Sequence, residues 1–132
     1  WSSSTRSARA PGAMTPYFEG RVGPGWDQLG TRTSDEDLTE VLRRLKRRPL
    51  DYFRMFYGDT ALFGAWHAME SGLAFFGADH VMFGTDFPFD PERGPGFIRD
   101  TIAAMEQMRA SDLDKAKIYE GNARRLLRLK LA

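Results

Sequence analysis

Two short apolar runs, each followed by a polar turn that contains an aspartate, constrain the fold of this chain most. The first run, Tyr52–Tyr57, leads into Gly58-Asp59-Thr60, and the second, Val81–Phe83, leads into Gly84-Thr85-Asp86. Between them, residues 61–71 repeat apolar side chains at helical spacing. The order strand, helix, strand predicts two parallel strands joined by a crossover helix.

Further helices are predicted on both sides of this unit. Ser34 and the acids after it predict the start of a helix over residues 35–47, which Pro49 would end. The crossover helix would stop at Gly72. Later in the chain we expect a helix from Phe97 to Met108, a helix capped by Ser111, and a break at Gly121-Asn122 where Asn122 would cap a short terminal helix.

A pair of parallel strands is too little to make a complete sheet of this kind. Parallel sheets are nearly always covered on both faces, and two strands cannot close a barrel. No internal repeat supplies more strands. Residues 12–132 therefore read as one part of a larger α/β structure, whereas residues 1–11 are polar and aperiodic and are predicted to be a disordered or non-native leader.

Composition narrows the possible partners. The chain has 19 Lys and Arg against 18 Asp and Glu, so its overall charge gives no reason to expect nucleic acid. The basic cluster between Arg43 and Arg48 could bind a polyanion, but a solvated helix end is the favoured interpretation. No cysteine and no membrane-spanning run are present. A cytoplasmic protein with a small-molecule substrate and no membrane partner is predicted.

Asp86 is the strongest candidate for a metal ligand. An acid at the C-terminal end of a buried parallel strand points toward the edge where sites are built, and a carboxylate is a hard donor for a divalent metal. An aspartate at this position also fits a turn or a helix cap, and from the residue type alone this structural role is slightly favoured over metal binding. Asp59 occupies the matching position on the first strand, with capping of the next helix as its alternative role.

Four motifs resemble, in order, the C-terminal part of the metal-dependent amidohydrolase-related family that includes aminocarboxymuconate-semialdehyde and γ-resorcylate decarboxylases. The motifs are Gly12-Ala13-Met14-Thr15-Pro16-Tyr17-Phe18-Glu19-Gly20-Arg21, Tyr57-Gly58-Asp59-Thr60-Ala61, Phe83-Gly84-Thr85-Asp86-Phe87-Pro88-Phe89 and Ile118-Tyr119-Glu120-Gly121-Asn122-Ala123-Arg124-Arg125-Leu126-Leu127. The resemblance implies the C-terminal portion of a (β/α)8 TIM barrel, containing strands seven and eight with their flanking helices.

The same resemblance implies a chemistry. Asp86 matches the strand-eight aspartate that coordinates the catalytic metal, which is zinc in most members and manganese or magnesium in others. The implied enzyme is a decarboxylase or hydrolase of a small carboxylated, aromatic substrate, and association into a homo-oligomer or through exposed barrel surfaces is expected. Asp59, Phe87 and Phe89 are candidates for the substrate pocket, although a packed loop explains the two phenylalanines equally well.

The family's metal-binding histidines have no counterpart in this sequence. His80 lies six residues before Asp86, roughly 20 Å away along an extended strand, which places it at the opposite end. His67 is expected on the outer face of the crossover helix. One aspartate is not a complete metal site, so we assign no catalytic residue and predict that this chain alone is inactive. The alternative is a non-catalytic α/β module that binds a partner or associates with copies of itself.

Overall fold

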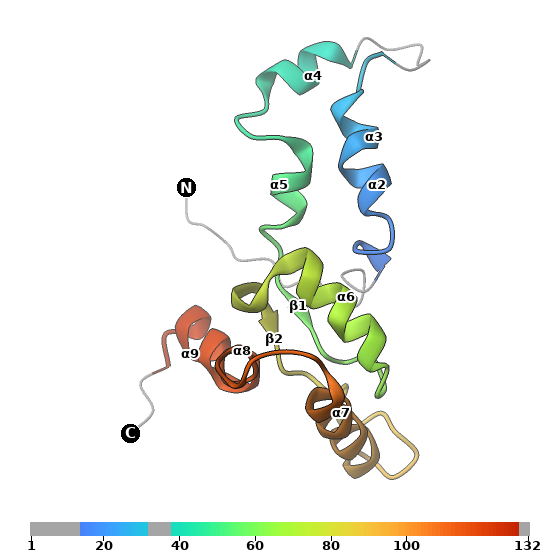
Figure 1. Ribbon diagram of the computed structural model, residues 1–132, viewed down its shortest axis with the longest axis vertical. Helices are drawn as coiled ribbons and strands as arrows, with labels where there is room; N and C mark the ends of the chain where they lie inside the picture. The colour runs from blue at the N-terminus through green and yellow to red at the C-terminus, as the bar shows by residue number, and fades with distance from the viewer. Residues whose placement is uncertain (1–13, 32–37, 130–132) are drawn as a thin grey trace.

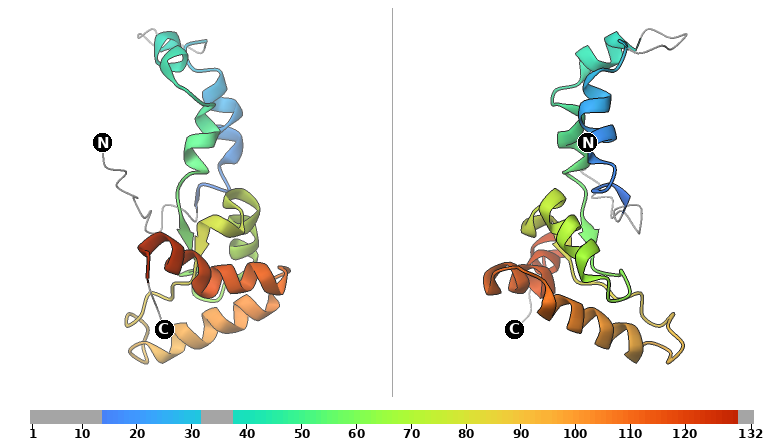
Figure 2. Two further views of the ribbon diagram at one scale, coloured as in Figure 1. Left: turned by 90° about the vertical axis from the view of Figure 1, so that its left-hand side faces the viewer. Right: turned by 45° about the vertical axis from the view of Figure 1, so that its right-hand side comes forward.

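The computed structural model describes residues 14–31 and 38–129. A helical arm and a body that contains both strands can be distinguished (Figures 1 and 2). The arm comprises α2 (Glu19–Val22), α3 (Pro24–Asp27), α4 (Thr39–Arg44) and α5 (Pro49–Phe53). The body comprises β1 (Gly58–Asp59), α6 (Trp66–Phe76), η1 (Ala78–His80), β2 (Val81–Met82), α7 (Pro95–Gln107), α8 (Asp112–Ala116), η2 (Lys117–Gly121) and α9 (Asn122–Leu127). The predicted leader, residues 1–11, lies outside the described residues.

The two strands form the predicted parallel pair. Gly58 lies opposite Val81 and Asp59 opposite Met82, with α6 as the crossover between them. Among the described residues, no further strand pairs with either of them. Because both strands run in the same direction, their C-terminal ends, which carry the two candidate aspartates, lie at one edge of the sheet.

The core of the body forms where α6, α7 and the C-terminal helices meet β2. Its buried members are Met69, Val81, Ala104, Met105, Met108 and Ile118. Around them pack Leu62, Trp66, Leu73, Phe76, Phe83, Ala110 and Tyr119. Met105 on α7 and Ile118 on η2 have no exposed surface. Apolar residues at helical spacing along α7 produce this face, as the sequence predicted.

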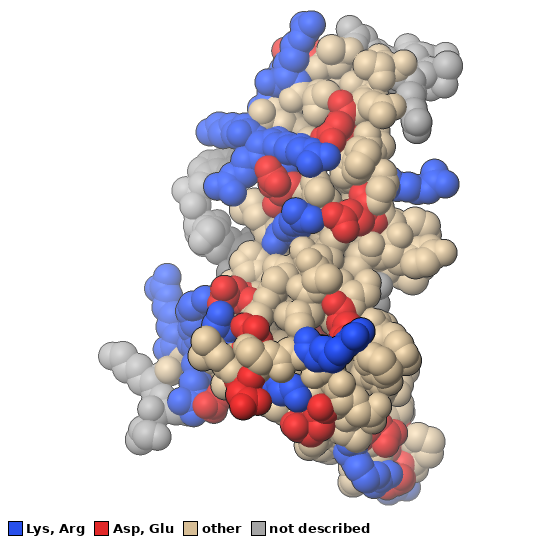
Figure 3. Space-filling view, in the orientation of Figure 1, with Lys and Arg blue, Asp and Glu red and all other residues tan. Residues whose placement is uncertain are grey.

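Ion pairs and ring contacts hold the helices of the arm together. Arg48 pairs with Asp27 on α3, and Arg54 pairs with Glu19 on α2 at 2.8 Å. The rings of Trp26 and Phe53 meet edge to face, with their centroids 5.7 Å apart. Figure 3 shows basic side chains on the arm interspersed with acidic ones. The pairing fits the solvated-face interpretation of the basic cluster better than a polyanion site.

Two elements of the N-terminal half differ from the sequence expectation. Helix α4 ends at Arg44, because Leu45 turns to an extended conformation, and the part of the predicted 35–47 helix before residue 38 lies outside the described residues. Pro49 starts α5 instead of only ending the helix before it. Its fixed φ suits a first helical position. The predicted strand Tyr52–Tyr57 is therefore wrong: the chain is helical to Phe53 and the strand begins at Gly58.

The crossover and terminal helices also differ from expectation. Helix α6 runs from Trp66 to Phe76, later than the predicted 61–71, and continues through Gly72 to Gly77, where φ is 76°. A glycine inside a helix costs about 1 kcal/mol but does not end it when neighbouring side chains are buried. At the other predicted break, Asn122 has helical dihedrals and is the first residue of α9, so its side chain does not cap that helix as predicted. Ser111 does cap α8, accepting from the Asp114 N–H at 3.1 Å.

None of the helices in the described ranges has the length and apolar character to cross a bilayer.

Candidate metal site at the ends of the strands

A buried threonine joins the ends of the two strands. Thr60, directly after β1, is 1% exposed. Its hydroxyl donates to the Gly84 carbonyl at 2.9 Å and accepts from the Gly84 N–H at 3.0 Å, while its own N–H donates to the Met82 carbonyl at 3.1 Å. The pair of strands thus stays in register up to the residues that precede Asp86. Sequence reasoning missed Thr60, although its place directly after the strand end at Gly58-Asp59 is a usable signal.

Asp59 caps the chain after β1 and also faces Asp86. Its Oδ1 accepts from the Ala61 N–H at 3.1 Å. A Cβ placed on Gly84 would lie 3.3 Å from the Asp59 Cβ, so glycine at that position lets the carboxylate lie against β2. Burial and, to a smaller extent, the charge of Asp86 raise the pKa of Asp59, and the Ala61 N–H only partly opposes this. The predicted helix-capping role of Asp59 is wrong, because α6 begins only at Trp66 without a side-chain cap, and the bond to Ala61 instead closes a turn directly after β1.

Asp59→Asn should stabilise the chain modestly at neutral pH, raising the melting temperature by about 1–3 °C. The variant keeps the oxygen that accepts from Ala61 and removes a half-buried charge next to Asp86. Because folding raises the pKa of Asp59, ionisation costs stability above that pKa, and the cost disappears as the pH falls below about 4. Thermal melts of both proteins from pH 7 to pH 3 should converge, whereas the exposed-site control Asp112→Asn, in the first turn of α8, should give no stabilisation at neutral pH.

Asp86 lies in a turn that leaves its carboxylate exposed. Its φ is 58°, in the left-handed region that aspartate tolerates better than most residues. The Asp86 carbonyl accepts from the Phe89 N–H at 2.9 Å, and the Thr85 hydroxyl accepts from the Phe87 N–H at 3.2 Å. Aspartate readily adopts this conformation in turns, and bonds on both sides hold it here.

Three aromatic side chains lie near these strand ends in sequence and remain largely exposed. Phe87 is 60% and Phe89 is 82% exposed. The ring of Phe87 occupies the space where a Cβ on Gly94 would stand, so only glycine fits there. Phe63, in the loop after β1, contacts Phe97 with the two rings tilted by 34° and their centroids 4.4 Å apart. Sequence reasoning missed Phe63, which no local pattern distinguishes from a core residue.

The histidines lie away from the two aspartates, as predicted. His80 precedes β2, where its Nδ1 is 2.8 Å from the Arg54 carbonyl oxygen and its ring stacks on Tyr57. His67 lies in the first turn of α6, stacked on Trp66. Within residues 14–31 and 38–129, no three His, Asp or Glu side chains gather closely enough to hold a metal ion. Asp59 and Asp86 fit one side of a metal centre and do not form a whole one.

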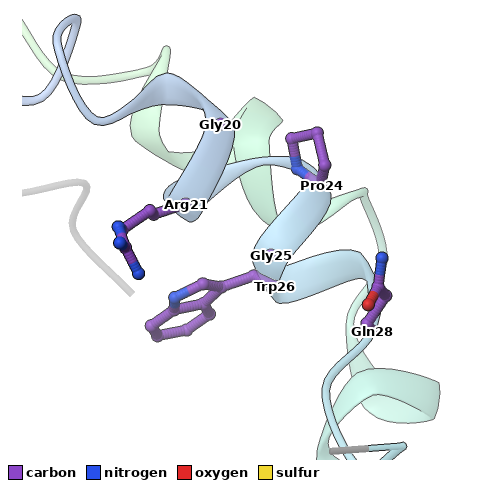
Figure 4. Close-up of a pocket in the computed structure, with 6 residues that line it drawn as sticks. All are labelled: Gly20, Arg21, Pro24, Gly25, Trp26 and Gln28. Atoms are coloured by element: carbon purple, nitrogen blue, oxygen red, sulfur yellow. The ribbon is translucent and has the colours of Figure 1, made fainter.

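A hollow of about 380 Å³ lies elsewhere, on the arm (Figure 4). It is lined by Gly20, Arg21, Pro24, Gly25, Trp26 and Gln28. No carboxylate or imidazole lines it, so it lacks the donors of a metal site. Glu19, next to it in sequence, pairs with Arg54 and supports the arm.

A sequence profile of the amidohydrolase family matches residues 22–129, which is most of the chain. The chain belongs to the amidohydrolase family. No curated protein matches the chain by sequence.

Solved decarboxylases share the fold. Dihydroxybenzoic acid decarboxylase from a Polaromonas species, solved with manganese and 2-nitroresorcinol, is 27% identical with a TM-score of 0.63, and the match covers 90% of this chain and 32% of that one. A 2,6-dihydroxybenzoate decarboxylase bound to 2,6-dihydroxybenzoate is 24% identical (TM-score 0.62; 89% and 32% covered). The 5-carboxyvanillate decarboxylase of Sphingomonas paucimobilis is 20% identical (TM-score 0.61; 89% and 31% covered).

These matches confirm the expected fold class. The chain spans about a third of the length of the decarboxylases, matching their C-terminal part with two parallel strands and the helices around them. The last two likenesses lie below 25% identity and establish the fold alone. In the first, a divalent metal is present in the relative.

Proposed function

We propose that Asp86 is a ligand of a divalent metal in an amidohydrolase (β/α)8 barrel in which β1 and β2 are strands seven and eight. The observation that carries this is the placement of Asp59 and Asp86 at the C-terminal ends of adjacent parallel strands, close enough for the charge of Asp86 to raise the pKa of Asp59. Active sites of such barrels are built at that end. Zinc is the metal expected from the family resemblance, and manganese is the metal that the Polaromonas relative binds.

The proposed reaction is decarboxylation or hydrolysis of a small aromatic carboxylate in the cytoplasm. The names of the relatives support this class, because they act on dihydroxybenzoate and carboxyvanillate. A bound metal supplies positive charge that orients a carboxylated substrate or activates water. From this chain, Asp86 would hold the metal, Asp59 would face the same mouth, and Phe87 and Phe89 would line the aromatic part of the pocket.

Asp86→Asn should remove a weak, localised manganese site from the chain. Two carboxylates without further protein ligands should bind Mn²⁺ with a dissociation constant on the order of 1 mM. In nitrogen-15 NMR spectra, substoichiometric Mn²⁺ should broaden the amides of residues 59–61 and 84–87 first, because the ion is paramagnetic. Asparagine tolerates the left-handed backbone of position 86, so the variant should keep the fold and lose most of this broadening.

Asp112→Asn is the matched control, because it removes one exposed carboxylate on α8 away from the strand ends. It should leave the broadening at residues 59–61 and 84–87 unchanged. Broadening centred on another acidic pair, such as Asp79 and Asp114 around Lys117, would contradict the assignment of Asp86.

The reaction class is tested by an activity assay on an assembled barrel. The chain can be produced together with the part of the Polaromonas decarboxylase that precedes its matched third. Release of carbon dioxide from 2,6-dihydroxybenzoate by the co-purified pair, lost in Asp86→Asn, would support a decarboxylase. A co-purified pair that retains activity in the variant would exclude Asp86 from the metal centre.

A second candidate function is association without catalysis. Large apolar side chains exposed on the body favour it, since contiguous exposed apolar surface usually marks an interaction site. They are Phe63, Phe87, Phe89, Ile102, Leu113, Leu127 and Leu129. Two results would favour a non-catalytic association module over a metal-dependent enzyme. Light scattering would show association that depends on concentration, and Mn²⁺ broadening would be the same in Asp86→Asn as in the unmodified chain.

A further inference from the structure

The edge of β2 that faces away from β1 is held by the C-terminal helix. Residues 81 and 83 direct their backbone groups to that edge, because Met82 between them bonds toward β1. The Phe83 N–H donates to the Ile118 carbonyl at 2.8 Å. The Val81 carbonyl accepts from Asn122 Nδ2 at 2.7 Å. The C-terminal helical segment therefore supplies hydrogen-bond partners for two backbone groups of β2, the Phe83 N–H and the Val81 carbonyl, which in a larger sheet would bond to another strand.

A π-helical turn makes the Ile118 carbonyl available. In a regular α-helix this carbonyl would accept from the N–H of Asn122, four residues later. Here the Asn122 N–H donates instead to Lys117, five residues earlier, within η2. The widened turn frees the Ile118 oxygen to accept from Phe83. Such turns are frequent at functional sites because they release a backbone group for another use.

The side chain of Asn122 uses every polar atom it has. It is 1% exposed. Nδ2 donates to the Ala78 carbonyl at 2.6 Å as well as to Val81, and Oδ1 accepts from Arg125 at 3.1 Å. The same Arg125 nitrogen donates to the Asp79 carbonyl at 2.6 Å. Three carbonyls of residues 78–81, where the chain enters β2, are thus fixed from one turn of α9.

We infer that Asn122 is a positioning residue: together with the π-turn carbonyl of Ile118, it sets the place of β2 and, through that strand, the place of Asp86. Between Phe83, the last residue bonded to this helix, and Asp86 lie only Gly84, which bonds to Thr60, and Thr85. A shift of β2 along the helix would therefore move the carboxylate with it. The link to metal binding rests on the function proposed above, whereas the anchoring itself does not.

The anchoring is tested by NMR on the full chain. In the unmodified protein, a scalar coupling through the hydrogen bond should connect the Phe83 nitrogen to the Ile118 carbonyl carbon. In Asn122→Ala, amide hydrogen exchange at Phe83 should accelerate about 10-fold more than exchange at Met105 in the core of α7, because local opening of the β2 edge becomes easier than global unfolding.

Ser111→Ala is the control that weakens the same helical segment without touching β2. It removes the cap that accepts from the Asp114 N–H, and it should accelerate exchange in α8 but not selectively at Phe83. Asn122→Asp keeps the shape of the side chain and removes both donors, so it should behave like Asn122→Ala. Equal acceleration at Phe83 and Met105, or the same effect in Ser111→Ala, would mean that Asn122 stabilises the fold as a whole and does not specifically position β2.

The two proposals fail separately. If Mn²⁺ does not broaden the amide signals of residues 59–61 and 84–87 in the unmodified chain, the assignment of Asp86 as a metal ligand is wrong. The amide-exchange result at Phe83 is independent of this outcome. If the coupling between Phe83 and Ile118 is absent from the unmodified chain, the anchoring is wrong even where the Asn122 variants do not fold. When both hold, Asn122→Ala should weaken Mn²⁺ broadening at Asp86 several-fold and Ser111→Ala should not.

Discussion

Met105→Ala should lower the free energy of unfolding by about 3 kcal/mol and the melting temperature by about 10–15 °C. Met105 has no exposed surface and lies in the cluster that joins α7 to Met69, Val81 and Ile118. Truncation removes the apolar contacts of the side chain and leaves a cavity that the surrounding helices fill only partly. Because small domains are marginally stable, a loss of this size is a large part of the total.

Ile102→Ala is the matched control for this substitution. Ile102 lies on the same helix but is 42% exposed and is not part of the buried cluster. Its truncation should cost less than about 1 kcal/mol. The comparison is made by thermal and urea unfolding followed by circular dichroism. Equal effects at the two positions would mean that the packing of α7 against β2 is not the core of the body in solution.

Local patterns predicted the elements whose stability depends on local chemistry. Helix α7 has apolar residues at helical spacing, and Ser111 caps α8 with the bond expected of its side chain. The strand Val81–Met82 is a short apolar run closed by a glycine. In these cases the residue type, its neighbours and its backbone preference agree, so no tertiary contact was needed to identify them.

The errors occurred where a local pattern permits two structures. The run Tyr52–Tyr57 is short and aromatic, and such a run fits a buried helix turn as well as a strand. The proline at position 49 decided the outcome by starting α5. Gly121-Asn122 resembles a helix boundary, yet Asn122 bonds to carbonyls more than 40 residues earlier, at Ala78 and Val81. No local pattern contains that information.

The candidate site was also predictable only in part. The order of the elements in the sequence is enough to place Asp59 and Asp86 at one edge of the sheet, because parallel strands end together. Thr60, which ties the two ends, and the raised pKa of Asp59 depend on distances across the pair of strands. A sequence pattern does not give those distances. The metal role of Asp86 stays a prediction from family resemblance and geometry.

Asp90→Ala should lower the melting temperature by more than about 5 °C, the largest effect expected from a polar residue of this chain. Asp90 is buried in the loop between Asp86 and α7. Its carboxylate accepts from the Glu92 N–H at 2.7 Å and from the Phe97 N–H at 3.2 Å. Alanine would leave these donors at the start of α7 without their partner.

The charge of Asp90 makes this stabilisation depend on pH. Burial alone would raise the pKa of Asp90, but the backbone N–H groups of Gly94, Phe97, Glu92 and Gly96 outweigh burial and lower it. A lowered pKa in the folded state means that the stabilisation is complete above the ordinary value near 4 and is lost as the pH falls through the folded value. The difference between the unmodified chain and Asp90→Asn should therefore be constant from pH 8 to about pH 5 and shrink below about pH 4. A difference that grew on acidification would mean that the carboxylate is not ionised in this loop, and the loop that joins Asp86 to α7 would then be held by other contacts.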